Sequence, residues 1–250
     1  MVKIINKKNI TNSDSLNYRI KFNKKYSQYN FDSWIRKFYN FKKNKNILDI
    51  GCGDGKQIDF AIKMSNKNSK IVGLDLSTKS IKKISSKYKN IKYLNLINTD
   101  MDNIRKINKR LKNYQFDLIH STYSIYYSNK PLKLITFLKS KLKKNSRLII
   151  TLPGETNTLK RILRIKEDRK LINKAKLEKF FIKNFDKVQI NFLNNYLKIK
   201  KVEDVIKFYI SSGIFDKNKI NFLEKYVEKE IKKNGYFKIN KSSIMLIGHI

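Results

Sequence analysis

The stretch NILDIGCGDGK, residues 46–56, joins a short apolar run to a loop that holds three glycines within five residues. The run is apolar except for Asp49, as expected for a strand that is covered on both faces. Residues 56–65 then place apolar side chains at helical spacing. Glycines between a strand and a helix let a ligand approach the backbone, and the helix N-terminus offers free N–H groups. The stretch therefore predicts a strand, a ligand-binding turn and a helix.

The same alternation continues along the chain. Ser77 is a suitable N-cap for a helix over residues 78–88, and Pro131 is suited to open a helix over residues 131–145. Further strands are expected at residues 70–77, in a segment that ends near Asp100, at 116–127 and at 146–154. Strands that alternate with helices indicate an α/β fold with a parallel, doubly wound sheet.

The segments on either side of this core differ from it. Aromatic residues at helical spacing over residues 13–44 predict one or two helices, the second at about 31–40. After Gly154 we expect a helical stretch at 155–185, a sixth strand at 187–199, helices at 201–215 and 219–233, and a last strand at 235–250 that follows a helix stop at Gly235. We expect one domain over residues 1–250, with N-terminal helices at 13–43, a core at 44–154 and a helical insertion at about 200–235 before the last strand.

The chain is strongly basic, with 57 Lys and Arg against 20 Asp and Glu, a net charge of +37. Such an excess indicates nucleic acid or another polyanion as a partner. The alternative is compositional bias, because lysine is spread over the whole chain and arginine, the better phosphate ligand, is scarce. The dispersal favours bias, although in either case the positive field favours an anionic substrate.

The compartment is suggested by what the sequence contains. Cys52 is the only cysteine, so an internal disulfide cannot form, as is usual in a reducing cytoplasm. No run of about 18 or more uncharged apolar residues occurs, and residues 1–15 lack the apolar segment of a secretory signal. We expect a cytoplasmic protein without a membrane span. Within the glycine loop, we expect Cys52 to be a small side chain that fills space.

Two carboxylates follow the next two strands. Asp75 ends the second strand, 20 residues beyond Gly55 (75 − 55), where it can accept both hydroxyls of a ribose. Asp100 ends the third strand and is followed by Met101, a pair that suits the amine and the face of an adenine. The glycine spacing is G-x-G-x-G, unlike the G-x-G-x-x-G of dinucleotide-binding loops. These features together indicate an adenosyl ligand.

This order of motifs resembles the class I S-adenosylmethionine-dependent methyltransferases. The resemblance covers roughly residues 44–154 and lies in LDIGCGDG, GLDLS, NTDMDN, FDLIHSTYSIYY and SRLIITLPG. It implies a Rossmann-like, seven-stranded methyltransferase sheet whose last strand is antiparallel, with N-terminal helices and a helical lid insertion. It also implies S-adenosyl-L-methionine as cofactor, bound over the carboxyl ends of the strands, and S-adenosyl-L-homocysteine as product.

The resemblance assigns cofactor contacts to the residues of these motifs. The glycines would border the methionine half of the cofactor, and Asp49 would orient its amino group. Asp75 would hold the ribose, Leu76 would pack on the adenine, and Asp100 and Met101 would bracket the base. The expected cofactor-binding set is Asp49, Gly51, Cys52, Gly53, Gly55, Asp75, Leu76, Asp100, Met101 and His120.

The catalytic requirement depends on the acceptor. Methyl transfer from a sulfonium is a one-step displacement in which the protein aligns acceptor, methyl group and leaving sulfur. A hydroxyl or ammonium acceptor must lose a proton, whereas a carboxylate or phosphoryl oxygen is already anionic. His120 is the candidate general base; the alternative is a histidine that packs against the cofactor or bonds to backbone.

Candidate acceptor contacts come from two regions. Tyr123, Tyr126 and Tyr127 follow the fourth strand, and each could instead belong to the core. Tyr18, Arg19 and Tyr26 lie where the N-terminal helix of the resembled family often closes over the cofactor. Arg19 could equally be a solvated helix charge.

Several acceptor classes are disfavoured. HSTY stands where amino-methyltransferases carry N-P-P-Y, Cys52 lies outside the motif in which a pyrimidine-C5 enzyme needs its nucleophile, and two histidines cannot build a multi-histidine metal site. The chain is similar to methyltransferases of bacterial sugar, capsule and secondary-metabolite pathways, including those that methylate a capsule phosphoramidate. We expect O-methylation of a small anionic, capsule-related metabolite. The alternatives are an RNA methyltransferase, an N-methyltransferase of a nucleotide sugar or secondary metabolite, and a non-catalytic scaffold.

Overall fold

The computed structural model describes residues 13–43, 45–65, 68–154, 158–165 and 174–250. The chain forms two compact units, and each is described by itself. The larger unit consists of residues 32–152, 169–192 and 244–250, and the smaller unit of residues 1–31, 153–168 and 193–243. The expectations for residues 1–12, and for the parts of the helical stretch at 155–157 and 166–173, lie outside the described residues.

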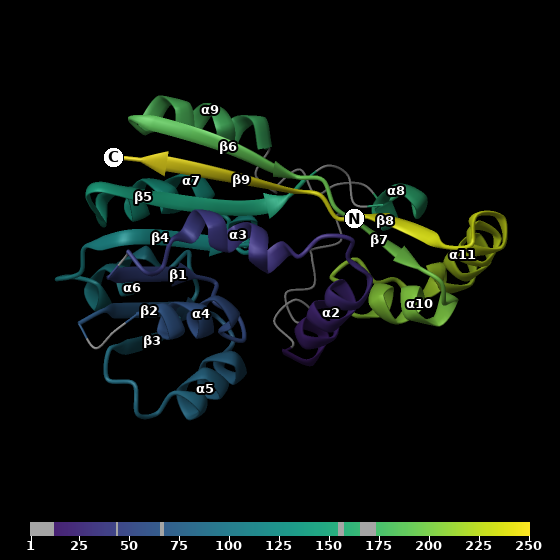
Figure 1. Ribbon diagram of the computed structural model, residues 1–250, viewed down its shortest axis with the longest axis horizontal. Coiled ribbons are helices and arrows are strands. Elements are labelled where there is room, and N and C mark those ends of the chain that lie inside the picture. Colours follow the sequence, from purple (N-terminus) through teal and green to yellow (C-terminus); the bar gives the residue numbers. More distant parts are fainter. Residues whose placement is uncertain (1–12, 44, 66–67, 155–157, 166–173) are drawn as a thin grey trace. The chain divides into compact units, whose positions relative to one another are not determined.

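The larger unit is built on a seven-stranded sheet in the order β3-β2-β1-β4-β5-β9-β6 (Figure 1). The strands are β1 (Asn46–Ile50), β2 (Lys70–Asp75), β3 (Leu94–Asn98), β4 (Phe116–Thr122), β5 (Leu142–Pro153), β6 (Lys187–Leu193) and β9 (Ser243–His249). The first five pair with one another in parallel. The end of β9 lies beside the starts of β5 and β6, since Ile250 N donates to Ser146 O (3.2 Å) and Asp186 N to His249 O (3.0 Å). Strand β9 thus runs against both neighbours, which confirms the expected fold class (Figure 1).

Helices connect these strands. They are α3 (Phe31–Tyr39), α4 (Lys56–Met64), α5 (Thr78–Lys87), α6 (Ile104–Arg110), the 3-10 turn η1 (Ile125–Tyr127), α7 (Pro131–Ser140) and α9 (Lys174–Asn184). Two of them differ from the prediction: α6 was not predicted, and the predicted helix at 131–145 ends at Ser140 because residues 142–145 belong to β5. Ser77 caps α5, where its side chain accepts from Ser80 N, and Pro131 stands in the first turn of α7. Both helix starts are therefore confirmed.

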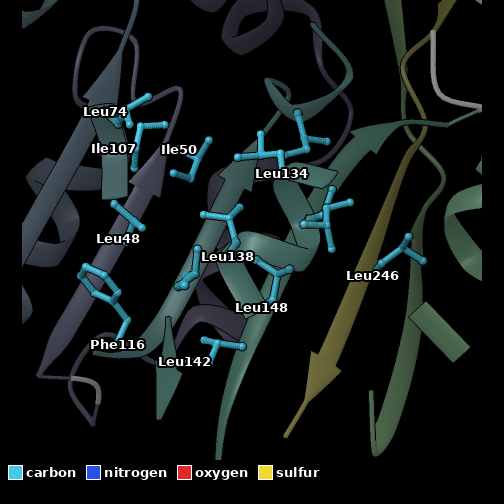
Figure 2. Close-up of a cluster of buried hydrophobic side chains, with 14 of the residues drawn as sticks. Leu48, Ile50, Leu74, Ile107, Phe116, Leu134, Leu138, Leu142, Leu148 and Leu246 are labelled. Carbon is cyan, nitrogen blue, oxygen red and sulfur yellow. The ribbon is translucent and has the colours of Figure 1, made fainter. Parts of the chain in front are cut away.

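The two faces of the sheet differ in chemistry because successive strand residues point to opposite sides. Leu48 and Ile50 of β1 belong to a buried cluster with Ile107 of α6 and Leu134 and Leu138 of α7 (Figure 2). Asp49 lies between them in sequence and points to the opposite face. The polar residue in this apolar strand thus faces away from the main hydrophobic core.

The smaller unit has its own core around a two-stranded sheet. Its elements are α2 (Ser13–Tyr26), α8 (Thr158–Ile162), β7 (Tyr196–Ile199), α10 (Val202–Ile210), the 3-10 turn η2 (Lys217–Lys219), α11 (Ile220–Asn234) and β8 (Phe237–Asn240). Phe22 of α2 stacks on Phe208 of α10 with ring centroids 4.4 Å apart. Gly235 ends α11 with φ 75°, which confirms the predicted helix stop. No helix among the described residues is long and apolar enough to span a membrane.

Three strands are shorter than predicted: those expected at 187–199, at 235–250 and at 116–127. Residues 187–199 split into β6 and β7, which belong to different sheets, and residues 235–250 split into β8 and β9. Asn195 causes the first break, because its side chain accepts from Tyr29 N (3.3 Å) and donates to Ser27 Oγ (2.6 Å). At the second break Asn240 Oδ1 accepts from Ser242 N (2.9 Å) and turns the chain.

The fourth strand ends at Thr122 instead of residue 127. Tyr123 has φ 55°, a left-handed conformation that a strand cannot continue through. Residues 125–127 then form η1. Tyr126 and Tyr127 therefore lie on a turn beyond the strand.

Candidate active site

The glycine loop after β1 adopts a backbone that favours glycine at each of its three positions. Gly51, Gly53 and Gly55 have φ values of 71°, 52° and 83°. A Cβ on Gly51 would lie 2.3 Å from Ser124 Cβ, and one on Gly55 would lie 2.7 Å from Ile84 Cγ1. The amides of Gly51 and Cys52 both donate to Leu74 O, at 2.7 and 3.0 Å. The loop is thus held against β2, α5 and the end of β4.

Asp75 at the end of β2 is positioned by backbone amides. Its Oδ2 accepts from Gly53 N (2.7 Å) and its Oδ1 from Ser77 N (2.8 Å). Burial raises the pKa of the Asp75 carboxyl, and these two hydrogen bonds act in the opposite direction. A carboxylate offers roughly four acceptor positions, so acceptor capacity remains for a ligand hydroxyl.

The turn after Asp75 is fixed by Asn98, which the sequence analysis did not single out. Asn98 Nδ2 donates to the carbonyls of Asp75 and Leu76, each at 3.0 Å. Leu76 is 45 % exposed directly after this carboxylate. An exposed leucine beside a group that can bind ribose suits the face of a nucleobase. The position of Asn98, an amide side chain at the end of β3 beside the end of β2, could have revealed this role in the sequence.

The end of β3 meets the same region. Thr99 N donates to Asp75 O (3.0 Å), and Met101 Cε lies 3.7 Å from the Cβ position of Gly51. Asp100 Oδ1 accepts from Asp102 N (2.9 Å). The glycine loop, Asp75 and the Asp100–Met101 turn therefore converge on one edge of the sheet.

Asp102, also missed from the sequence, joins this turn to the segment before α7. Its carboxylate accepts from Ser128 Oγ, from Asn129 N (2.8 Å) and from Asn129 Nδ2 (2.9 Å). The partners lie 26 and 27 residues further along the chain, so no local pattern reveals the contact. Asp102 supports the neighbouring Asp100 and Met101.

Asp49 and His120 form a buried polar pair on β1 and β4. Asp49 is 2 % exposed and His120 is 1 % exposed, and Asp49 Oδ1 lies 3.4 Å from His120 Nδ1. Burial raises the pKa of Asp49 well above its ordinary value, with a further contribution from Asp75, and burial lowers the pKa of His120 to about 3. His120 is thus neutral near neutral pH, and its contact with Asp49 is no ion pair.

His120 is enclosed by aromatic rings. The ring of Tyr39 lies 4.5 Å and that of Phe41 5.7 Å from the imidazole, between centroids. Within the described residues, His120 Nδ1 and Asp49 Oδ2 have no hydrogen-bond partner. General-base catalysis by His120 stays a prediction, and its burial favours the alternative of a packed histidine.

Cys52 packs beneath the glycine loop. The thiol is 8 % exposed and its Sγ lies 3.2 Å from the Cβ position of Gly73. Burial, and then the nearby Asp49 and Asp75, raise the pKa of Cys52 well above its ordinary value. A protonated, buried thiol is a poor nucleophile, which favours a packing role for Cys52, and its contact with a cofactor stays a prediction.

The residues after β4 close the edge of the sheet. Tyr123 N donates to Thr151 O (2.9 Å), and Ser124 Oγ donates to Ile50 O at the end of β1. The rings of Tyr126 and Tyr127 lie 4.4 Å apart in η1. Ser124 was missed in the sequence because a serine among tyrosines carries no pattern. Ser124 fills the space that Gly51 leaves because it has no side chain.

The three candidates on α2 belong to the smaller unit. Tyr26 donates to the carboxylate of Asp204 on α10, and Arg19 donates to Ser211 O. The hydrogen bond from Tyr26 lowers the pKa of Asp204, and Lys25 (3.0 Å) adds to the effect. Tyr18 lies partly buried against the core of the same unit. Their contact with an acceptor stays a prediction.

The comparisons with known proteins point to the same kind of site as the geometry at the ends of the strands. The family model described as a methyltransferase domain matches residues 41–190. No curated protein matches the sequence. Among the described residues, no group of His, Cys, Asp or Glu is arranged to hold a metal ion.

Solved structures share the fold at low identity. A SAM-dependent methyltransferase from Archaeoglobus fulgidus has a TM-score of 0.55 and 18% identity, with 88% of this chain and 92% of that chain covered. YcgJ from Bacillus subtilis has a TM-score of 0.60 and 14% identity, with 87% and 96% covered. The plantazolicin methyltransferase BamL has a TM-score of 0.54 and 13% identity, with 98% and 97% covered. Because its family model spans more than half of the chain, the protein belongs to the methyltransferase domain family and is an enzyme of methyl transfer.

Proposed function

We propose that the protein transfers the methyl group of S-adenosyl-L-methionine to an oxygen of a small anionic metabolite, and that S-adenosyl-L-homocysteine is the second product. The observation that carries the proposal is the convergence of the glycine loop, Asp75 and Met101 at the ends of β1, β2 and β3. In sheets of this order, ligands bind where the strand order reverses, here between β1 and β4.

The residues present fit the cofactor. The remaining acceptor capacity of Asp75 suits the hydroxyls of a ribose, and Leu76 offers an apolar face for the adenine. Gly51, with its positive φ, lets the methionine half approach the backbone. The unpartnered Oδ2 of Asp49, among the described residues, suits a ligand ammonium group. When bound, the cofactor supplies an electrophilic methyl group on a sulfonium.

The protein's own contribution is alignment. Asp75 and the loop hold the donor, while Tyr123, Tyr126 and Tyr127 shape the acceptor side. Tyr123 holds a left-handed backbone at the end of β4, a strained conformation of the kind that clusters at active sites. We propose that the acceptor oxygen is ionised on arrival, so that His120 takes no proton.

The acceptor class rests on charge and resemblance. The net charge of +37 attracts an anion. The solved structure of the plantazolicin methyltransferase BamL, a protein of this fold, is a complex with a triazolic desmethylPZN analog and SAH. The likeness to capsule-pathway methyltransferases suggests a capsule or surface-polysaccharide precursor, including a nucleotide-linked phosphoramidate. We propose a cytoplasmic location, because the chain's single cysteine fits a reducing compartment.

Calorimetry on cofactor-stripped protein tests the donor. One equivalent of S-adenosyl-L-methionine should bind, and the absence of any binding heat or thermal stabilisation would refute the proposal. The acceptor is tested with phosphorylated and nucleotide-linked sugars, each beside its dephosphorylated counterpart, and radiolabelled donor. Methylation should require the anionic group. Equal methylation of the neutral counterparts would show that the acceptor need not be anionic.

His120→Asn separates the two mechanisms. Removing a general base costs about 10²–10⁴ in turnover. An acceptor that is already ionised predicts a loss below about tenfold in folded protein. A pH profile of kcat without an ascending limb near the histidine pKa would support the same conclusion.

A further inference from the structure

The two-stranded sheet of the smaller unit has two chemically opposite faces. The antiparallel register pairs Leu197 with Ile239 and Ile199 with Phe237, and all four side chains are buried at 0–2 % exposure. Because strand residues alternate between faces, the remaining residues share the other face. We call it the Tyr–Lys face; it consists of Tyr196, Lys198 and Lys200 from β7 and its end, and Tyr236, Lys238 and Asn240 from β8 and its start.

Lysines and tyrosines interleave on this face. Lys198 and Lys238 are direct cross-strand partners. The Nζ of Lys198 lies 4.9 Å from the Tyr236 ring centroid and 5.8 Å from that of Tyr196, and the Nζ of Lys238 lies 4.5 Å from that of Tyr196. Like charges directly opposite one another destabilise a sheet. The arrangement therefore gains from an anion that would lie between the two ammonium groups.

The chemistry of the face selects the anion. Two rings beside paired ammonium groups, on a strand pair backed by a hydrophobic core, match the way proteins hold single strands: bases stack on aromatic rings and lysines meet the phosphates. The stacking of a base on a tyrosine stabilises the complex by more than the free energy lost when an exposed cation–π contact breaks. Each lysine can therefore move from its ring to a phosphate. A simple phosphate would use the lysines and leave the rings without a role.

We propose that the Tyr–Lys face binds single-stranded nucleic acid. The net charge of +37 supports such a partner by attracting a polyanion to the whole chain. The inference goes beyond the proposed methyl transfer and does not depend on it, because the face belongs to the smaller unit and needs no cofactor. Failure of either proposal leaves the other standing.

Fluorescence anisotropy of the full chain, without cofactor, on a labelled twelve-nucleotide oligouridine tests the proposal. Tyr196→Leu with Tyr236→Leu keeps the apolar bulk and removes the stacking surfaces. We expect at least about thirtyfold weaker binding with an unchanged salt slope, since stacking is worth about 1–3 kcal/mol per base. Lys198→Gln with Lys238→Gln should lower the slope of log K against log salt by about 1.4, or about 0.7 per phosphate.

Two control pairs on α11 match these changes. Phe222→Leu with Tyr226→Leu removes exposed aromatic rings from the same unit, and Lys232→Gln with Lys233→Gln removes two exposed lysines. Both pairs should bind within about twofold of wild type. Three outcomes would overturn the proposal: wild-type affinity in the Tyr196/Tyr236 variant, equal losses in the control variants, and equal binding of a double-stranded RNA. Each would indicate that the RNA binds through charge, without stacking on the two tyrosines.

A second measurement on the unmodified protein covers variants that fail to fold. Photo-crosslinking with 4-thiouridine RNA, followed by mass spectrometry, should label peptides that contain Tyr196 or Tyr236. Crosslinks confined to other peptides would overturn the assignment.

Discussion

Gly51 and Ser124 pack so closely that a Cβ on the glycine would lie 2.3 Å from the serine Cβ. The contact joins the end of β1 to the residues after β4, on the two sides of the point at which the strand order reverses. It explains why the glycine loop cannot shift without displacing the turn that carries Tyr123, Tyr126 and Tyr127. The donor and acceptor sides of the proposed site therefore share one rigid boundary.

Gly51→Ala should damage both stability and cofactor binding. The substitution combines a left-handed φ of 71° with a steric clash, and we expect a loss of about 2–4 kcal/mol in the free energy of unfolding. Gly235→Ala is the matched control, because Gly235 has φ 75° and no atom within 4 Å of its Cβ position. Its cost should be about 1–2 kcal/mol. Equal losses in the two variants, measured by chemical denaturation, would show that the contact with Ser124 is unimportant.

Asp75→Asn should weaken cofactor binding while the fold persists. An amide nitrogen would replace an acceptor at Gly53 N or Ser77 N, and a ribose hydroxyl would lose a charged partner. A hydrogen bond to a charged group is worth about 1.5–3 kcal/mol, so affinity should fall by about 10–150-fold in calorimetry. Asp59→Asn, which loses a surface pair with Lys87, is the control and should bind as wild type. Unchanged affinity in Asp75→Asn would remove the ribose assignment.

His120 should make the protein less stable in mild acid. Its pKa is lowered to about 3 in the folded state, whereas the unfolded chain takes up the proton near pH 6.5. The unfolded state therefore binds more protons between these values, and stability is lost as the pH falls below about 6.5. From pH 7 to pH 5 the His120 contribution should be about 2 kcal/mol.

Denaturation of wild type and His120→Asn at both pH values checks this contribution. The difference in stability between pH 7 and pH 5 should be smaller in the variant by about the same 2 kcal/mol. His249, whose pKa is also lowered, is the other histidine of the chain, so His249→Asn serves as the comparison. An identical pH dependence in His120→Asn and wild type would contradict the burial of a neutral imidazole.

Tyr26→Phe should loosen the smaller unit. The phenol donates to Asp204, a hydrogen bond to a charged group, and its loss should cost about 1–3 kcal/mol. Tyr29→Phe is the control, because Tyr29 is 56 % exposed, and should change stability by less than about 0.5 kcal/mol. Proteolysis or hydrogen exchange over residues 13–26 and 202–210 reports the local effect. If both variants protect these residues equally from proteolysis or exchange, the hydrogen bond between Tyr26 and Asp204 does not hold α2 against α10.

The sequence predicted the features that depend on neighbours along the chain. The apolar run of β1, the cap at Ser77, the proline at the start of α7 and the stop at Gly235 each follow from local backbone chemistry. The alternation of strands and helices likewise predicted a parallel, doubly wound sheet, and the resemblance to methyltransferases implied its seventh, antiparallel strand. Local rules sufficed for this part of the fold.

The features that the sequence did not reveal depend on distant partners. Asn195 ends a strand through residues near position 28, and Asp102 binds residues beyond β4. Ser124 fills a space that exists only because Gly51 lacks a side chain. The burial of His120 depends on Tyr39 and Phe41, which precede the first strand of the sheet. Such contacts require the tertiary structure.

The smaller unit is assembled from three separated stretches of chain, residues 1–31, 153–168 and 193–243. A graft that exchanges it between relatives would need several splices made together, because all three stretches contribute buried side chains to its core. Shuffling of whole modules is consequently a poor route to a new specificity in this architecture. Diversification by single-residue replacement within an intact chain is the route that the connectivity leaves open.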